Sequence, residues 1–209
     1  MSNKLRVALL FGLLWTLAGA SPAQTVQEDD YARLVDLKSP AVSPDATRAA
    51  VVVSRVLWND DKRSGTLVLV DLATGANRTL IGDRENVSDP AFSPDGSRLA
   101  FLARAGTGKD AHTQVFVMPL DGGDDAHAVT HSDSGVDEFV WRPDGRALAY
   151  AAADSDPPRS GADRFRDSFI FTTEPVVARE APRPSHLFTV SLDGGAATQL
   201  TFGAESASD

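Results

Sequence analysis

The sequence contains no cysteine among its 209 residues. This absence excludes disulfide bonds, thiolate-bound metal sites and a lipid anchor on cysteine. The pattern G-x-S-x-G, which presents the catalytic serine of α/β-hydrolases, is missing as well. After the first 24 residues no stretch is long and apolar enough to cross a bilayer, which takes about 20 residues. The residues present therefore supply no nucleophile elbow, no cysteine chemistry and no internal membrane span.

Basic residues are fewer than acidic ones, at 20 against 29, which gives a formal net charge of −9. An acidic surface repels phosphate backbones and anionic lipids, so it argues against nucleic acid and against a membrane surface as partners. Hydrophobic residues make up 42% of the chain, which is enough for a buried core and unlike the composition of disordered proteins.

The amino terminus has the order of a secretory signal peptide. Lys4 and Arg6 precede an apolar run over residues 7–17, and Ala18-Gly19-Ala20-Ser21-Pro22-Ala23 follows. A basic start, a short apolar stretch and small residues at its end are typical of such signals, whereas a membrane anchor needs a longer run. We expect residues 1–23 to be a signal peptide cleaved after Ala20 or Ala23. The mature protein, with a net charge of −11, is then expected to be periplasmic or secreted, with no membrane association.

One pattern recurs three times at nearly equal spacing. It stands as Ser93-Pro94-Asp95-Gly96-Ser97-Arg98, as Ser43-Pro44-Asp45-Ala46-Thr47-Arg48 and as Arg142-Pro143-Asp144-Gly145-Arg146, with the prolines 50 and 49 residues apart. Serine, proline, aspartate and glycine each favour a tight turn between two strands. A period of this size built from short strands predicts a β-propeller.

Each repeat holds four short strands joined by hairpin turns, as in one propeller blade. We therefore predict an all-β chain in which residues 39–209 form a partial propeller, with blades at about 39–82, 87–131 and 135–203. Residues 24–38 are expected to be a short helix or an irregular lead-in. Closed propellers have about four to eight blades, so about three blades predict an incomplete propeller and a fragment of a longer protein. A complete three-bladed protein is the alternative.

The third repeat is longer than the others. The turn Leu192-Asp193-Gly194-Gly195 comes 49 residues after Pro143, whereas the corresponding intervals are 28 and 26 in the first two repeats. An insertion of about 20 residues is thus expected within residues 154–184. It contains Phe165, Phe169 and Phe171, which a disordered linker usually lacks. An extra hairpin that contacts a further domain or narrows substrate entry, and a solvated rim loop, both remain open.

No residue is predicted to be catalytic, to bind a cofactor or to ligate a metal. His127 and His131 are four residues apart, but on a strand this spacing is about 13 Å, so we interpret both as solvent-facing. Asp121, Asp124 and Asp125 lack the register of a calcium loop. Gly106-Thr107-Gly108-Lys109 lacks the spacing of a phosphate loop. The aspartate of each turn recurs in every blade and is interpreted as structural. Four repeated aromatic residues are expected in the core: Phe92, Phe101, Trp141 and Tyr150.

The repeated pattern resembles the propeller repeats of the Tol system. Asp30-Tyr31-Ala32-Arg33-Leu34 before the first repeat, the turns Asp71-Leu72-Ala73-Thr74-Gly75 and Leu120-Asp121-Gly122-Gly123, and the long third blade add a second resemblance. Together they resemble the amino-terminal propeller of prolyl-oligopeptidase-family serine peptidases, in the acylaminoacyl-peptidase-like branch. Ala46, where glycine is expected, and Arg142, where serine is expected, depart from the repeat.

This resemblance implies a seven- or eight-bladed propeller that restricts entry of peptide substrates to an α/β-hydrolase domain, which would follow Asp209. The expected partners are that domain of the same polypeptide and small peptides, and no cofactor is implied. No catalytic position of the family has a counterpart in these residues. The alternative is a non-catalytic periplasmic propeller of the Tol type that binds other proteins. A third possibility is a sensor propeller joined to another output domain.

Overall fold

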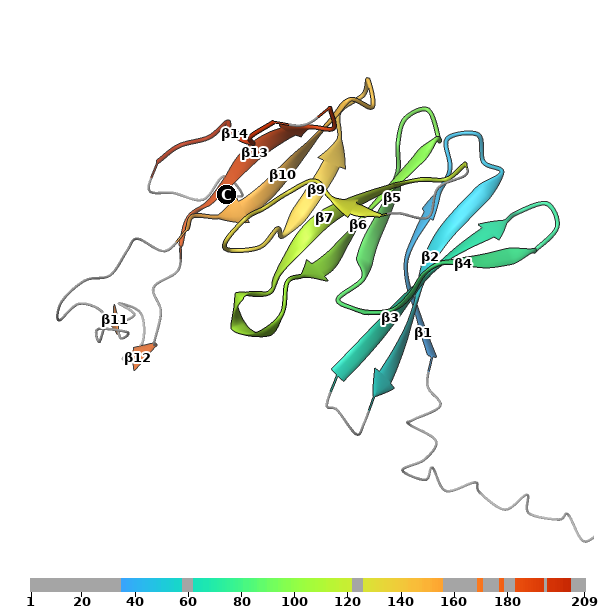
Figure 1. Cartoon of the computed structure of the whole chain (residues 1–209), viewed down its shortest axis with the longest axis horizontal. Coiled ribbons are helices and arrows are strands. Elements are labelled where there is room, and N and C mark those ends of the chain that lie inside the picture. Colours follow the sequence, from blue (N-terminus) through green and yellow to red (C-terminus); the bar gives the residue numbers. More distant parts are fainter. Residues whose placement is uncertain are drawn as a thin grey trace, which may run out of the picture.

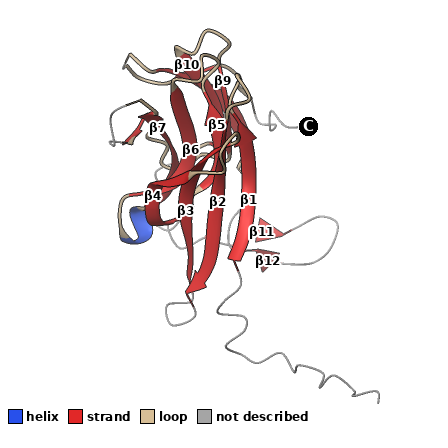
Figure 2. Ribbon diagram, turned by 90° about the vertical axis from the view of Figure 1, so that its right-hand side faces the viewer, coloured by secondary structure: helices blue, strands red, loops and turns tan. Residues whose placement is uncertain are grey.

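The computed structural model describes residues 35–57, 62–121, 126–155, 169–170, 177–178, 183–193 and 195–203. It contains three four-stranded antiparallel sheets, each with its strands in chain order from one edge to the other. The sheets lie side by side along the chain (Figure 1), and Figure 2 shows the first of them face-on. The predicted all-β fold, with four-stranded blades of a partial β-propeller, is confirmed.

The bounds of the strands follow the turn chemistry of the repeats. The first blade comprises β1 (Val35–Val42), β2 (Arg48–Leu57), β3 (Lys62–Asp71) and β4 (Asn77–Glu85). The second comprises β5 (Ser88–Phe92), β6 (Arg98–Ala105), β7 (His112–Pro119) and β8 (His127–Ala128), with the 3-10 turn η2 (Gly108–Asp110) between β6 and β7. The third comprises β9 (Glu138–Trp141), β10 (Ala147–Ala153), β13 (Ser185–Ser191) and β14 (Thr198–Gln199).

Two strands start earlier than the sequence predicts. Local sequence favours a helical or irregular lead-in over residues 35–38, but they belong to β1, where Leu37 pairs with Val53. The polar segment 59–65 favours a loop, but its residues 62–65 begin β3. In both cases ladder hydrogen bonds to a long β2 satisfy the backbone, so pairing outweighs the weak local preference of polar residues. Residues 1–34, which hold the signal-peptide prediction, lie outside the described residues.

The core consists of two layers, one on each side of the second blade. Leu99 and Phe101 of β6 face the first blade, where they pack with Leu67. Ala100 and Leu102 face the third blade and pack with Leu148. Alternate residues of one strand therefore enter two different cores, which is why this strand is apolar on both faces. Burial of each large side chain stabilises the packed blades by about 1.5–3 kcal/mol.

The repeated aromatic residues lie in these layers, as the sequence predicts. Phe101 is fully buried and stacks on Phe116, with 5.7 Å between ring centroids. Phe92 and Tyr150 are buried as well. Trp141 is partly buried and donates its indole N–H to the Ala91 carbonyl of the preceding blade at 3.0 Å. The aromatic repeat therefore joins neighbouring blades.

Within the insertion the structure describes one short ladder. Strand β11 (Phe169–Ile170) pairs antiparallel with β12 (Val177–Ala178). This pairing agrees with the extra hairpin that the sequence left open against a rim loop, while the remaining residues of 156–182 lie outside the described part. Among the described residues no helix has the length and apolar character to cross a membrane.

Candidate functional site

The repeated turns form a row along one edge of the blades. In the turn of the second blade, Ser93 donates its hydroxyl hydrogen to Asp95 and accepts a hydrogen bond from the Arg98 amide at 2.9 Å. Asp95 also accepts from the Ser97 amide at 3.0 Å. A Cβ placed on Gly96 would lie 3.6 Å from Pro44 of the preceding turn, and one placed on Gly145 would lie 3.6 Å from Pro94. The turns thus stack blade upon blade.

Hydrogen bonds within the turns lower the pKa of their aspartates. The Ser93 hydroxyl, followed by the Ser97 amide and hydroxyl, lowers the pKa of Asp95 to about 2. In the first blade Ser43 and then Thr47 lower the pKa of Asp45 to about 2. These carboxylates are engaged by their own turns. Their structural interpretation agrees with this geometry.

In the third turn an arginine, rather than a serine, donates the side-chain hydrogen bonds to the aspartate. Arg142 replaces the serine, and its guanidinium donates two hydrogen bonds to Asp144, from Nε to Oδ1 at 2.8 Å and from Nη2 to Oδ2 at 2.7 Å. This bidentate pair, with the Arg146 amide, lowers the pKa of Asp144 to about 2. The departure at Arg142 therefore preserves the turn. The departure at Ala46 leaves an alanine in a left-handed conformation, at φ 55°.

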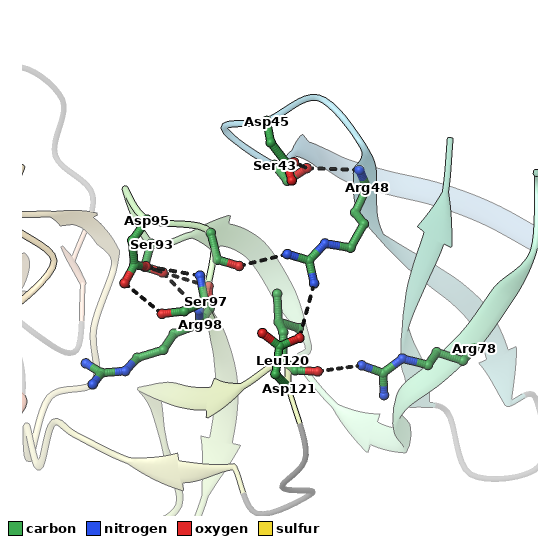
Figure 3. Close-up of polar contacts among 11 residues, drawn as sticks. Ser43, Asp45, Arg48, Arg78, Ser93, Asp95, Ser97, Arg98, Leu120 and Asp121 are labelled. Carbon is green, nitrogen blue, oxygen red and sulfur yellow. Dashed lines mark hydrogen bonds and ion pairs between the residues drawn. The ribbon is translucent and has the colours of Figure 1, made fainter. Parts of the chain in front are cut away.

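A hollow of about 300 Å³ opens beside this row, between the first and second blades. Its walls come from the ends of β2, β3, β4 and β7, and Figure 3 shows its polar contacts. The lining residues are Arg48, Leu69, Asp71, Ala76, Asn77, Arg78, Leu120 and Asp121.

Two guanidinium groups and two carboxylates line this hollow, so its formal charges balance. Arg48 donates to the Gly96 carbonyl at 3.0 Å, and its Nη1 lies 3.8 Å from Oδ1 of Asp121. Arg78 donates to the Leu120 carbonyl at 2.9 Å. Both contacts reach from the first blade to the second (Figure 3). Arg48 and Arg78 therefore hold the two blades together and also place two positive charges at one opening.

The two carboxylates of the hollow differ in their availability. Asp71 accepts hydrogen bonds from Ala73, from the Thr74 amide and from the Thr74 hydroxyl, and the Thr74 contacts lower its pKa. Asp121 is 83% exposed and meets Arg48 only at ion-pair distance. An exposed pair of this kind contributes about 0–1 kcal/mol. Asp71 is therefore held by its turn, whereas the contact of Asp121 among the described residues is this long ion pair.

A second hollow, of about 340 Å³, lies along the first strands of the three blades, β1, β5 and β9. Ser39, Asp89 and Glu138 occupy corresponding places in the repeat and line it. The Ser39 hydroxyl donates to Asp89 at 3.1 Å, and both residues have positive φ, at 47° and 49°. This backbone makes a bulge in β1 and in β5, where the pairing register shifts.

A third hollow, of about 270 Å³, lies where the insertion leaves the third blade, and Asp154 is part of its lining. The nearby His186 is 2% exposed, with Nε2 at 3.5 Å from Asp154 Oδ2 and Nδ1 at 3.4 Å from the Thr201 hydroxyl. Arg183 donates to the Asp154 carbonyl at 3.1 Å. These contacts fix the two ends of the insertion against the blade.

The candidate residues named from the sequence lie apart from one another in the structure. His127 and His131 are both exposed, as predicted. Asp121 lines the hollow between the blades, and Asp124 and Asp125 lie outside the described residues. Gly108 begins the 3-10 turn η2 and its carbonyl accepts from Arg104, so this loop is a connection between β6 and β7. In the described ranges no three His, Asp or Glu side chains gather to hold a metal.

Sequence reasoning missed the pair of arginines. Arg48 belongs to the repeated turn pattern and reads as structural, and Arg78 has no signal in its own neighbourhood. A comparison of the repeats supplies the available signal. Arg78 pairs with Leu69 in the first blade, and His127 pairs with Val117 at the corresponding place in the second. The fourth strands of the two blades therefore differ at this position.

No family model matches this sequence. Among curated proteins it is similar to the Bacillus subtilis protein Uncharacterized peptidase YuxL, with 33% identity over 124 residues. These residues are 59% of this chain and 18% of that relative, so the chain spans about a fifth of the length of the curated relative that it matches.

Two solved structures share the fold. The acylaminoacyl peptidase of Pyrococcus horikoshii superposes with a TM-score of 0.60 at 19% identity, over 82% of this chain and 26% of the other. A structure from Agrobacterium tumefaciens assigned as TolB superposes with a TM-score of 0.51 at 19% identity, over 79% of this chain and 48% of the other. The two resemblances noted in the sequence, to acylaminoacyl peptidase and Tol-type propellers, are confirmed as structural neighbours. At these identities the likeness establishes the fold.

Proposed function

We propose that this chain forms the amino-terminal blades of the propeller of an exported serine peptidase. In this proposal an α/β-hydrolase domain follows in the same polypeptide and cleaves small peptides, and the propeller restricts their entry. The observation that carries the proposal is the 33% identity to a peptidase over 124 residues, which lie within a protein several times longer than the matched region. The repeat and the long third blade support it as well.

In this proposal the described blades limit access of substrates and do not carry out the reaction. Their carboxylates at the turns are engaged by turn hydrogen bonds, and their cores fill both faces of the second blade. A rigid wall of this kind limits which substrates reach a neighbouring catalytic centre by size and shape. The reaction itself, in this proposal, belongs to a serine, an aspartate and a histidine outside the 209 residues.

The test is to read the frame beyond Asp209 and to assay the protein as its gene encodes it. We expect a G-x-S-x-G pattern followed by an aspartate and a histidine, and hydrolysis of blocked peptides that falls steeply with peptide length. The control is the same protein with the pattern's serine changed to alanine. An open reading frame that ends after further blades would refute the peptidase proposal. Equal cleavage of short peptides and of an unfolded protein would refute the restriction of substrate entry.

The second candidate is a non-catalytic propeller of the Tol type that binds other proteins. The similarity to the Agrobacterium tumefaciens structure, of which this chain covers nearly half, favours it. The same reading of the frame separates the candidates, since a binding propeller needs only enough blades to close.

Export is part of the proposal. The order of Lys4, Arg6, the apolar run and the small residues supports a cleavable signal. Amino-terminal sequencing of the mature protein should give Ser21 or Gln24 as its first residue, in the periplasm or the medium. An intact Met1 or Ser2 on a cytoplasmic product would contradict export.

A further inference from the structure

The two arginines of the hollow between the first two blades have more hydrogen-bond donors than their described contacts between these blades use. A guanidinium carries five N–H donors. Among described residues, Arg78 uses one of them, on the Leu120 carbonyl at 2.9 Å. Arg48 uses one on the Gly96 carbonyl at 3.0 Å and keeps a long contact of 3.8 Å to Asp121. Within the described part of the chain, donors of both arginines thus remain available at the mouth of the hollow.

The same arrangement is absent at the next described junction. Arg98 holds the place of Arg48 in its repeat, so it belongs to the next junction rather than to this hollow; it is exposed, and it extends away from Arg48 (Figure 3). His127 holds the place of Arg78, since it pairs with Val117 as Arg78 pairs with Leu69. The second and third blades pack without a pair of arginines between them in the described residues. Two arginines are therefore unnecessary for joining blades of this chain.

We infer that this hollow binds a carboxylate attached to a small apolar group. A guanidinium fork matches the two oxygens of a carboxylate in geometry and charge. Leu69 and Leu120 also line the hollow, and at 6% and 4% exposure they offer a small apolar contact beside the charged groups. The volume of about 300 Å³ suits a ligand of the size of one or two amino-acid residues. The end of a peptide and an acidic side chain both offer this chemistry.

Asp121 is the competing anion in the hollow. It is 83% exposed and only loosely paired with Arg48, so a ligand carboxylate can displace it at little cost. Asp71 keeps its negative charge, but three hydrogen bonds from its own turn to Oδ1 hold its carboxylate in place, so it is not the group that a ligand would displace. This inference concerns binding and does not depend on whether a catalytic domain follows.

The experiment is calorimetric titration of the protein as its gene encodes it with three probes. N-acetylleucine carries a terminal carboxylate and an apolar side chain, N-acetylleucinamide lacks the carboxylate, and N-acetylaspartic acid α-amide carries it on a side chain. We expect at least one acid to bind saturably with a dissociation constant of about one millimolar. The amide should bind at least about tenfold more weakly than this acid. Preference for the first acid identifies the end of a peptide as the ligand, and preference for the second identifies an acidic side chain.

Three variants assign the binding to this hollow. Arg78→Gln should weaken binding of the preferred acid about tenfold, because one charge-assisted hydrogen bond is lost. Asp121→Asn should strengthen it severalfold by removing the competing anion, which a purely structural role of Arg48 and Arg78 would not produce. The matched control Arg98→Gln should leave it unchanged. Should Arg78→Gln fail to fold, Arg78→Lys, with the charge kept and the fork lost, takes its place. Equal binding of acid and amide, no saturation at about ten millimolar, or no response to Asp121→Asn would overturn the inference.

Discussion

Replacing Ala46 by glycine should stabilise the protein. The structure holds Ala46 at φ 55°, in the position where the other two turns have Gly96 at 71° and Gly145 at 68°. A left-handed backbone costs a residue with a Cβ about 1–2 kcal/mol. Glycine removes this cost but adds about 0.4–1 kcal/mol of conformational entropy to the unfolded chain. The expected net gain in the free energy of unfolding is therefore about 0.5–1 kcal/mol.

The reverse change at the next turn should have the opposite sign. A Cβ on Gly96 would meet Pro44 at 3.6 Å, which is ordinary contact, so Gly96→Ala isolates the backbone cost. We expect a loss of about 0.5–1 kcal/mol. Ala73→Gly is the control, since Ala73 lies in an exposed turn at a negative φ and should lose stability through entropy alone.

The assay is urea unfolding of the wild type and the three variants under one set of conditions, with equal m-values as the condition for comparison. Stabilisation by Ala46→Gly together with destabilisation by Ala73→Gly supports the conformational explanation. If Ala46→Gly loses as much as Ala73→Gly, the left-handed turn carries no cost and the reasoning fails.

Three further changes test the turns and the core. The pKa of Asp95 is about 2 in the fold against 3.8 in the unfolded chain, so the stability that its carboxylate contributes is present above about pH 4 and is lost as the pH falls toward 2. Asp95→Asn should therefore flatten this part of the curve of stability against pH, and an unchanged slope would contradict the prediction. Phe101→Ala removes a fully buried ring and should cost about 3–5 kcal/mol in urea unfolding, and a cost below about 1 kcal/mol would show that the two blades do not share this core. Arg142→Ser restores the serine of the repeat, and its melting temperature should stay above that of Arg142→Ala, because serine can make the hydrogen bonds that Ser43 and Ser93 make; equal melting temperatures would mean that this residue does not support the turn.

The repeat made most of the fold predictable. Proline, aspartate and glycine at intervals of 50 and 49 residues locate three turns, and each turn fixes the strands before and after it. Leu99 through Leu102 are apolar on both faces, as a blade between two others requires, and the structure packs them against both neighbours. These features depend on local backbone chemistry and on alternation, which a sequence records directly.

Features that depend on pairing between distant segments were not predictable in the same way. Residues 35–38 end a segment that suggests a helical or irregular lead-in, and residues 62–65 end a polar segment that suggests a loop, yet both extend the ladder on the two sides of β2. The hollow between the blades needs Arg48, Arg78 and Asp121, which come from different segments of two blades. Their proximity follows from the packing of one blade on the next, and no local pattern in the sequence brings these three residues together.

Recurrence separates the structural residues of this chain from its candidates for function. The turn aspartates recur in every blade and are engaged by their own turns, and the aromatic residues recur and fill the core. A residue needed for the blade form as such must return with the period, because each blade presents the same problem of closing turns and packing faces. Arg78 does not return, and neither does the insertion of the third blade. These two departures leave the blades intact, so they are the places where this propeller differs from a generic one, and binding is to be sought there first.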